Sequence, residues 1–158
     1  MLAHKAFAES LVAGENAAGG GSAVDYRAVP AVVFSDPEIV SVGYTMGQAL
    51  RKGIDAGEVK LPIGGMARPL IEGSGEGFLK IVYEKPSKAV IGVHIAGPHA
   101  SELAGEAALA IEMGATLEDL ALTIHPHPTM SESIKEAAEL ALEKPIHYLL
   151  KRKRHSSA

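Results

Sequence analysis

The chain has 158 residues, of which 47% are hydrophobic and 4% aromatic, and its formal net charge is -4 at neutral pH. This acidic balance argues against nucleic acid as the main partner. The length fits one domain, or a smaller domain with an appendage. The sequence contains no cysteine, so it can form no disulfide, thiolate nucleophile or Cys-x-x-Cys metal site by itself. No apolar run reaches the roughly 18 residues that a membrane span requires.

The N-terminal region has the composition of a helix followed by a linker. Residues 2–13 are helix-forming with a partial apolar stripe. Lys5 and Glu9 fall in the first turns, which is not the pattern of a signal peptide. The run GENAAGGGSA that follows is typical of a flexible connection. We therefore expect a domain boundary near residues 19–22.

The middle of the chain has the patterns of β-strands. Thr45 and Gly53 are placed to begin and end a short helix between two of the strands. The Gly-rich stretch GGMARPLIEGSGEG is expected to be a connection, and FLKIVYEKPSKAVIGVHIAG is the clearest hairpin, with its turn at EKPSK. The expected strands lie at residues 32–34, 39–43 and 58–63 and within the hairpin at 78–97.

Helical patterns fill the rest of the chain, at residues 99–114, 116–124 and 129–144. Thr116, followed by Glu118 and Asp119, makes a good start for the second. The third has a core-facing apolar stripe at Met130, Ile134, Ala137, Ala138 and Ala141. In the last of these, Thr129 and Glu132 have the spacing of a capping box, which predicts a helix beginning after Thr129. Strands come mostly first and helices last. This order predicts an α+β fold in which an antiparallel sheet is flanked by helices.

The segment HPHPTMSE, residues 125–132, is the most informative motif. Its two prolines fix the backbone and disfavour helix at the residues before them. An extended His-Pro-His places both imidazoles on one side. A base on a short rigid segment suits general acid-base catalysis, and Glu132 is close enough in sequence to orient His127 or His125.

Structural interpretations of the same residues remain open. Glu132 is fully explained as the partner of the Thr129 amide, and both histidines can be ordinary loop residues. A metal site at His-x-His needs a further ligand, and nothing places His94 or His99 nearby. GGGS and GSGEG fit no nucleotide-binding glycine motif, and the basic end KRKRHSSA is typical of a solvated tail.

Three blocks in order, LAHKA, AVDYRAVPAVVFSDPEIVSVGYT and HPHPTMSE, resemble the C-terminal third of the dihydrolipoamide dehydrogenases, which are flavin-dependent pyridine-nucleotide disulfide oxidoreductases. The resemblance runs from Met1 to about Tyr148. It implies that residues 1–22 are a helix of an FAD domain plus a linker and that 23–148 are an interface (dimerisation) domain. Residues 149–158 then form a basic, disordered tail beyond the usual family end.

The resemblance also implies roles for single residues. In a homodimer, His127 would be the base that enters the partner subunit's active site, and Glu132 would orient it. The reaction converts dihydrolipoyl groups and NAD⁺ to lipoyl groups and NADH through FAD. The positions that match the family's short FAD-contacting segment are Met1, Leu2, Ala3 and His4.

The chain departs from the family in several ways. The Cys-x₄-Cys redox motif and the nucleotide-binding glycine fingerprint are missing, and Pro126 replaces a small residue between the histidines. We therefore expect a fragment that supplies the base but binds neither FAD nor NAD alone and is inactive alone.

The alternative is an association module without catalysis. It would bind itself or the lipoyl-bearing acyltransferase core of a 2-oxoacid dehydrogenase complex. A further option is a small protein that binds metal or an anionic surface through His-x-His and its basic tail. In the family interpretation we expect neither nucleic acid nor membrane as partner, no metal site, and a location in the bacterial cytoplasm or an organelle matrix.

Overall fold

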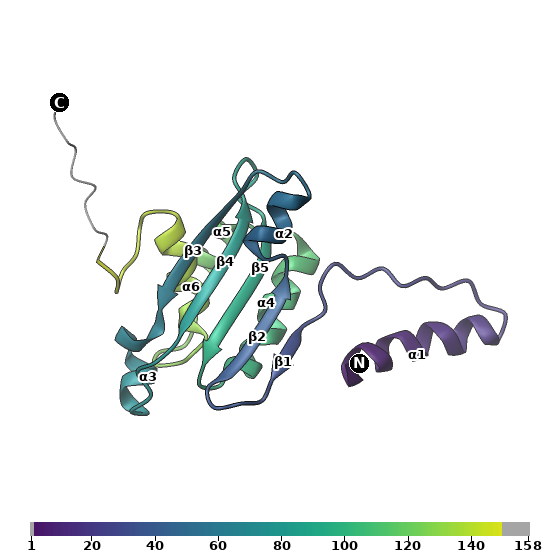
Figure 1. Ribbon diagram of the computed structural model, residues 1–158, viewed down its shortest axis with the longest axis horizontal. Coiled ribbons are helices and arrows are strands. Elements are labelled where there is room, and N and C mark those ends of the chain that lie inside the picture. The colour runs from purple at the N-terminus through teal and green to yellow at the C-terminus, as the bar shows by residue number, and fades with distance from the viewer. Residues whose placement is uncertain (1, 150–158) are drawn as a thin grey trace.

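The computed structural model describes residues 2–149, and over this range the chain forms a five-stranded antiparallel sheet with long helices behind it (Figure 1). The strand order is β1-β2-β5-β4-β3. The strands are β1 (Ala31–Val33), β2 (Glu38–Gly43), β3 (Ala56–Pro62), β4 (Phe78–Glu84) and β5 (Val90–Gly97). The helices are α1 (Ala3–Ala17), α2 (Met46–Arg51), the 3₁₀ turn η1 (Ile63–Gly65), α3 (Ala67–Ile71), α4 (Ala100–Met113), α5 (Leu117–Leu122) and α6 (Glu132–Ala141). The expected α+β class is confirmed.

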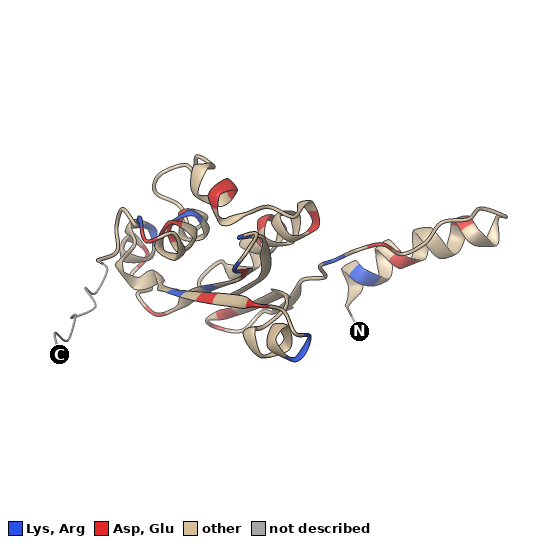
Figure 2. Cartoon of the chain, turned by 90° about the horizontal axis from the view of Figure 1, so that it is seen from above, with Lys and Arg blue, Asp and Glu red and all other residues tan. Residues whose placement is uncertain are grey.

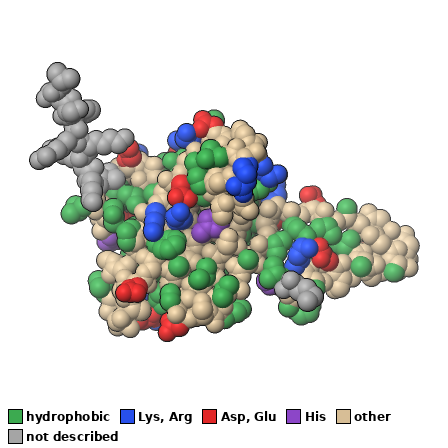
Figure 3. Space-filling model, viewed as in Figure 1, with side chains coloured by type: hydrophobic (Ala, Val, Ile, Leu, Met, Phe, Trp, Pro, Cys, Tyr) green, Lys and Arg blue, Asp and Glu red, His purple; other side chains and the backbone are tan. Residues whose placement is uncertain are grey.

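The two faces of the sheet have different environments, because alternate residues of a strand point to opposite sides. On the helix-covered face, the register aligns Val40 with Ile95 and Val42 with Val93, and all four side chains are buried. The opposite face, seen in Figure 3, mixes hydrophobic, charged and histidine side chains. The sheet therefore has one core face and one mixed face, on which Val82 packs with Ala49 of α2 and Ala56 in a small second cluster.

The long helices cover the core face in two places. α4 packs on β2 and β5, whereas α6 packs on β3 and β4. The apolar stripe expected for the last helix is buried at Met130, just before α6, and at Ile134, Ala137 and Ala138, whereas its fifth member, Ala141, is partly buried. Since α6 is fixed against the sheet through this stripe, the residues at its N-terminal end are held in a defined position.

Local helix signals agree with the structure in two of three cases. Thr45 caps α2, and its hydroxyl accepts from the amide of Gln48. Thr116 caps α5 in the same way, with Asp119 completing the capping box. The third expected cap is wrong, because the Thr129 hydroxyl donates to Pro126 and does not cap α6.

The Gly-rich stretch at residues 64–77 contains more structure than expected. It includes the end of η1 and the short helix α3, and Met66 and Pro69 within it are buried. The prediction of a plain connection failed because a five-residue helix is too short to show helical periodicity.

Helix α1 stands apart from the sheet and its covering helices (Figures 1 and 2). It continues to Ala17, past the expected end, and none of its residues is buried. Polar contacts join it to the following segment: His4 Nε2 lies 2.7 Å from the carbonyl oxygen of Pro30, and the Tyr26 hydroxyl donates to Glu9. Among residues 2–149, no helix has the length and apolarity needed to cross a bilayer.

The position of α6 depends on Ile134, which is 1% exposed. We expect Ile134→Ala to lower the free energy of unfolding by about 2–5 kcal/mol, because truncation leaves a cavity in the core. Leu109→Ala on the exposed face of α4 is the matched control, with an expected loss below about 1 kcal/mol. Urea denaturation followed by far-UV circular dichroism measures both, and equal losses would contradict this assignment of the core.

Candidate active-site segment

The HPHP motif lies in the connection between α5 and α6. α5 ends at Leu122 and α6 begins at Glu132, so residues 123–131 join two packed helices. The connection makes several hydrogen bonds of its own. The hydroxyl of Thr129 donates to the carbonyl oxygen of Pro126 at 2.7 Å and lies 2.9 Å from the hydroxyl of Ser131. The two histidines are thus presented by a closed, internally bonded loop.

Glu132 contacts His127 and the Thr129 amide at the same time. Its Oε1 atom lies 2.8 Å from His127 Nδ1, and its Oε2 atom accepts a 2.8 Å hydrogen bond from the Thr129 amide. Sequence reasoning treated helix capping and histidine orientation as competing roles of this carboxylate. In the structure they do not compete, because each oxygen takes one donor.

The helix does not begin after Thr129 as predicted. α6 begins at Glu132 with Ser131 preceding it, and no side chain caps that end. The residues just before it form a tight turn in which the Ser133 amide donates to Met130 and the Ile134 amide to Ser131. The Thr129 hydroxyl is turned toward Pro126, so only the glutamate half of the expected capping box forms.

The environment of Glu132 favours its ionised form. Burial of the carboxyl opposes ionisation, but the hydrogen bonds from the Thr129 amide and the His127 ring outweigh it, and the pKa of Glu132 is held below its usual value. The carboxyl side chain is 16% exposed, whereas the His127 ring is 62% exposed. An anchored carboxylate therefore supports an imidazole that extends into solvent.

This arrangement favours one tautomer of His127, with the proton on Nδ1. If Nδ1 carries the proton donated to Glu132, Nε2 is the nitrogen with a lone pair for a reacting proton. The carboxylate also stabilises the ring when both nitrogens are protonated. Chemically, the pair His127–Glu132 is suited to accept and return a proton at the protein surface.

His125 has a different environment from His127. Its side chain is 5% exposed, and its Nε2 atom lies 2.8 Å from Oε1 of Glu106 on α4. Its Nδ1 atom lies 3.1 Å from the carbonyl oxygen of Thr123. Glu106 was not found by sequence analysis, because only the three-dimensional fold brings α4 beside the HPHP motif.

Further ionisable side chains gather beside the motif. A cavity of about 120 Å³ is lined by His125, Glu132, Lys135, Glu136, Glu139 and His147, with two isoleucines. Within residues 2–149, no cluster of three or more His, Asp or Glu side chains has the geometry of a metal site. Instead, each histidine of the motif contacts its own glutamate, His125 contacting Glu106 and His127 contacting Glu132.

The expected FAD-contacting residues lie elsewhere in the molecule. Met1 is outside the described residues, as is most of the expected tail at 149–158. Leu2 precedes α1, whereas Ala3 and His4 form its first turn, and α1 lies beyond the β1 edge of the sheet (Figure 1). The structure does not bring these residues to His127, because α6 packs on β3 and β4 at the opposite edge.

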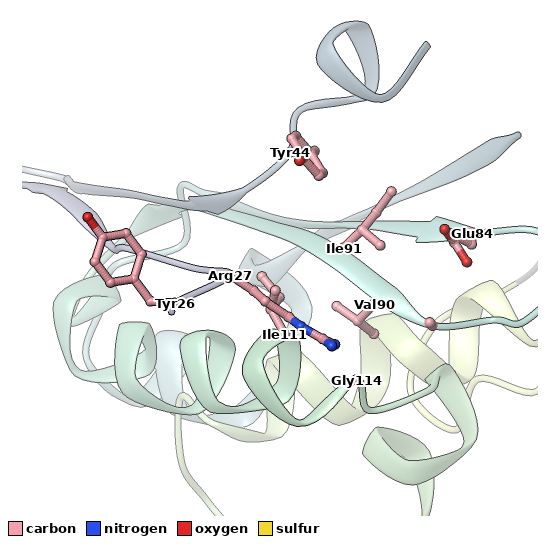
Figure 4. Close-up of a pocket in the computed structure, with 9 residues that line it drawn as sticks. Tyr26, Arg27, Tyr44, Glu84, Val90, Ile91, Ile111 and Gly114 are labelled. Atoms are coloured by element: carbon pink, nitrogen blue, oxygen red, sulfur yellow. The ribbon is translucent and has the colours of Figure 1, made fainter. Parts of the chain in front are cut away.

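A second concave region had no sequence signal. A cleft of about 420 Å³ lies where the segment before β1 passes the ends of β5 and α4, and its lining includes Tyr26, Arg27, Tyr44 and Glu84 (Figure 4). These residues come from separate parts of the sequence and fit no motif. None of the predicted site residues lines this cleft.

Comparison with known proteins identifies the family. The pyridine nucleotide-disulphide oxidoreductase dimerisation domain matches residues 29–138. Dihydrolipoyl dehydrogenase of Geobacillus stearothermophilus is 53% identical over 150 residues, which cover 95% of this chain and 32% of that protein. Dihydrolipoyl dehydrogenase of Halobacterium salinarum is 51% identical over 149 residues, covering 94% of this chain and 31% of the relative.

The fold is also similar to that of a solved structure. The crystal structure of LpdA from Mycobacterium tuberculosis superimposes with a TM-score of 0.73 and 35% identity, covering 82% of this chain and 28% of that one. The chain thus spans about a third of the length of the curated relatives it matches. On this evidence the chain belongs to the pyridine nucleotide-disulphide oxidoreductases and carries their dimerisation domain.

Proposed function

We propose that the chain is the C-terminal part of an FAD-dependent dihydrolipoyl dehydrogenase, in which it dimerises and supplies the acid-base residue. The observation that carries this proposal is the exposed His127 ring held at Nδ1 by the anchored carboxylate of Glu132. The overall reaction would convert dihydrolipoyl groups and NAD⁺ to lipoyl groups and NADH. Residues 23–148 would be the dimerisation domain, and residues 1–22 would belong to an FAD domain and its linker.

The proposed role of His127 is proton transfer to and from a dithiol. Nε2 would take a proton from one thiol of the dihydrolipoyl group, and Glu132 would stabilise the resulting imidazolium through Nδ1. When the resulting thiolate attacks the reacting disulfide and displaces one of its sulfurs, the same nitrogen would give the proton to that displaced thiolate. Because the sequence has no cysteine, the reacting disulfide must come from outside this chain, which suits a base that extends from its own surface.

The first turn of α1 has features that fit an FAD contact. Its N-terminal end has no side-chain cap and no acidic residue in the first turn, so its amides remain suited to an electron-rich group. Leu2, Ala3 and His4 would make this contact, with His4 fixed through its bond to Pro30. When bound, FAD and NAD⁺ would supply the electron acceptors. The isolated chain is expected to hold neither.

The proposed partners are a second copy of the chain and the lipoyl-bearing acyltransferase of a 2-oxoacid dehydrogenase complex. The family match to a dimerisation domain supports the first of these. We propose no nucleic acid or membrane partner, and a location in the bacterial cytoplasm or an organelle matrix.

A second function, association without catalysis, is favoured by a specific observation. Large apolar side chains are exposed on and near α4 and α5, at Leu109, Met113, Leu122 and Ile124. Exposed apolar groups of this size are typical of surfaces that bind a partner. In this case His127 would have no reaction to serve.

The acid-base role can be tested in a chimera. We would join the first two-thirds of the Geobacillus relative to this chain in place of the matching third, and measure NAD⁺ reduction by dihydrolipoamide. We expect His127→Gln to lower kcat by about 10²–10⁴-fold, the range for loss of a positioned acid-base group. His99→Gln, at an exposed histidine that faces Glu72 and lies outside the cavity beside the HPHP motif, is the control. A His127→Gln chimera as active as its parent would refute the acid-base proposal, and the 158-residue chain alone should show no turnover even with added FAD.

The contribution of Glu132 to stability should depend on pH. Because its pKa is lowered in the folded protein, its ionised form stabilises the fold above the ordinary glutamate pKa of about 4.5, and this stability is lost as the pH falls through the lowered value. Glu132→Gln should therefore be less stable than the parent near neutral pH, by about 1–2 kcal/mol, and the difference should shrink in acid. Urea denaturation from about pH 7 to about pH 3 measures this. A difference that stays constant with pH would contradict it.

The dimerisation role predicts self-association of the chain. Sedimentation equilibrium should show a dimer whose fraction rises with concentration. Ile124→Glu, which places a charge at an almost fully exposed apolar position, should shift the chain toward monomer if Ile124 lies in the interface. A chain that is monomeric at high concentration would contradict the role, and Leu70→Glu, at an exposed residue of α3, is the control.

A further inference from the structure

His125 has the contacts of an anchor within the α5–α6 connection. Its ring is buried and is held at both nitrogens, by the Thr123 carbonyl oxygen at Nδ1 and by Glu106 at Nε2. Glu106 lies on α4 between the buried residues Leu103 and Ala107, so its backbone belongs to a helix fixed on the sheet. The contact ties the start of the HPHP motif to the core.

The chemistry of the two contacts identifies the nitrogen that donates to Glu106. A carbonyl oxygen and a carboxylate both accept hydrogen bonds, and an imidazole N–H donates. The Nε2 atom lies 2.8 Å from Glu106, which is the shorter of the two contacts. A hydrogen bond from Nε2–H to the Glu106 carboxylate is strengthened by the negative charge of its acceptor.

The other ionisable groups near His125 have partners of their own. In the cavity beside it, Lys135 pairs with Glu139 at 2.9 Å, and Glu136 accepts the amide and faces the ring of His147. Glu132 is engaged with His127 and Thr129, as described above. Glu106 is therefore the carboxylate that binds the His125 ring.

His127 stands between two fixed points. On its C-terminal side, Glu132 holds both the ring and the Thr129 amide. On its N-terminal side, His125 is fixed by Glu106, and the proline between the histidines limits the backbone torsions that separate them. Loss of the contact between Glu106 and His125 would leave His127 held only on its C-terminal side, through Glu132. Small displacements of a reacting group cause large losses in rate.

We propose that Glu106 and His125 are positioning residues for His127: a hydrogen bond between α4 and the HPHP motif that sets where the base is presented. The catalytic consequence rests on the proposed function, whereas the hydrogen bond and its effect on the His127 ring do not. Neither residue touches the reacting groups. Their effect is exerted through the backbone from His125 to His127.

The protonation of His125 can be measured in the unmodified chain. Long-range ¹H–¹⁵N spectra of the ¹⁵N-labelled chain report whether each ring nitrogen carries a proton. We expect a proton on Nε2 of His125, the nitrogen that faces Glu106. A ring whose Nε2 carries no proton would overturn the hydrogen bond, and this result does not depend on any variant folding.

The positioning effect is tested by Glu106→Gln against Glu102→Gln, an exposed glutamate one turn earlier on the same helix. In the chain, Glu106→Gln should broaden or shift the His127 ring signals while the amide spectrum of the sheet is retained, and Glu102→Gln should leave them unchanged. In the chimera, Glu106→Gln should lower kcat by about ten- to a hundredfold with the KM for dihydrolipoamide within about twofold. Glu102→Gln should match the parent.

The outcomes separate the two proposals. Unchanged His127 signals in a folded Glu106→Gln chain, or an unchanged kcat in its chimera when His127→Gln is inactive, would overturn the positioning role. A fully active His127→Gln chimera would instead refute the acid-base function, and the ring spectra would still decide whether Glu106 orders His127. If Glu106→Gln does not fold, the ring spectra of the unmodified chain decide whether the hydrogen bond forms. Glu106→Asp, which keeps the carboxylate on a shorter side chain, then decides the positioning role in the same two assays.

Discussion

The candidate site depends on one carboxylate shared between two donors. Glu132 accepts from the Thr129 amide with one oxygen and faces the His127 ring with the other. The first contact fixes the path of the chain as it enters α6, and the second fixes the ring relative to that path. Because both contacts favour the ionised carboxylate, the structural role and the chemical role strengthen each other.

This carboxylate is effective because of the packing behind it. α6 lies on β3 and β4 through Ile134, Ala137 and Ala138, which are buried. The first residue of that helix therefore moves little relative to the sheet. A side chain held by a fixed hydrogen-bond partner loses less conformational entropy when a substrate binds. Because Glu132 is fixed by the packing of α6 and contacts His127, the exposed His127 ring is also held in place.

Sequence reasoning predicted the parts of the structure that depend on local pattern. The 78–97 hairpin, the caps at Thr45 and Thr116 and the buried stripe of α6 follow from alternation, helical spacing and capping chemistry. The start of α6 was misplaced because the hydroxyl of Thr129 bonds Pro126 instead of the helix end. Both uses of that hydroxyl are local, and the sequence does not rank them.

The contact between Glu106 and His125 was out of reach for a different reason. The two residues are 19 positions apart and belong to separate elements. A glutamate beside a buried helical stripe is ordinarily a solvated residue, and no spacing rule pairs it with a histidine beyond the next helix. The same limit applies to the cleft at Tyr26 and Arg27, whose lining the fold assembles from distant segments.

The two histidines of the motif meet two requirements, exposure and burial, that a single side chain cannot meet. A group that exchanges protons with an external dithiol must be exposed, whereas a group that fixes a loop must be buried and paired. His127 meets the first condition and His125 the second, with side-chain exposures of 62% and 5%. The proline between them limits the torsions that connect the rings, and its carbonyl oxygen is held by Thr129. A small residue at that position would leave the exposed ring coupled to its buried neighbour through a looser backbone, so Pro126 strengthens the mechanical link on which the proposed positioning of His127 depends.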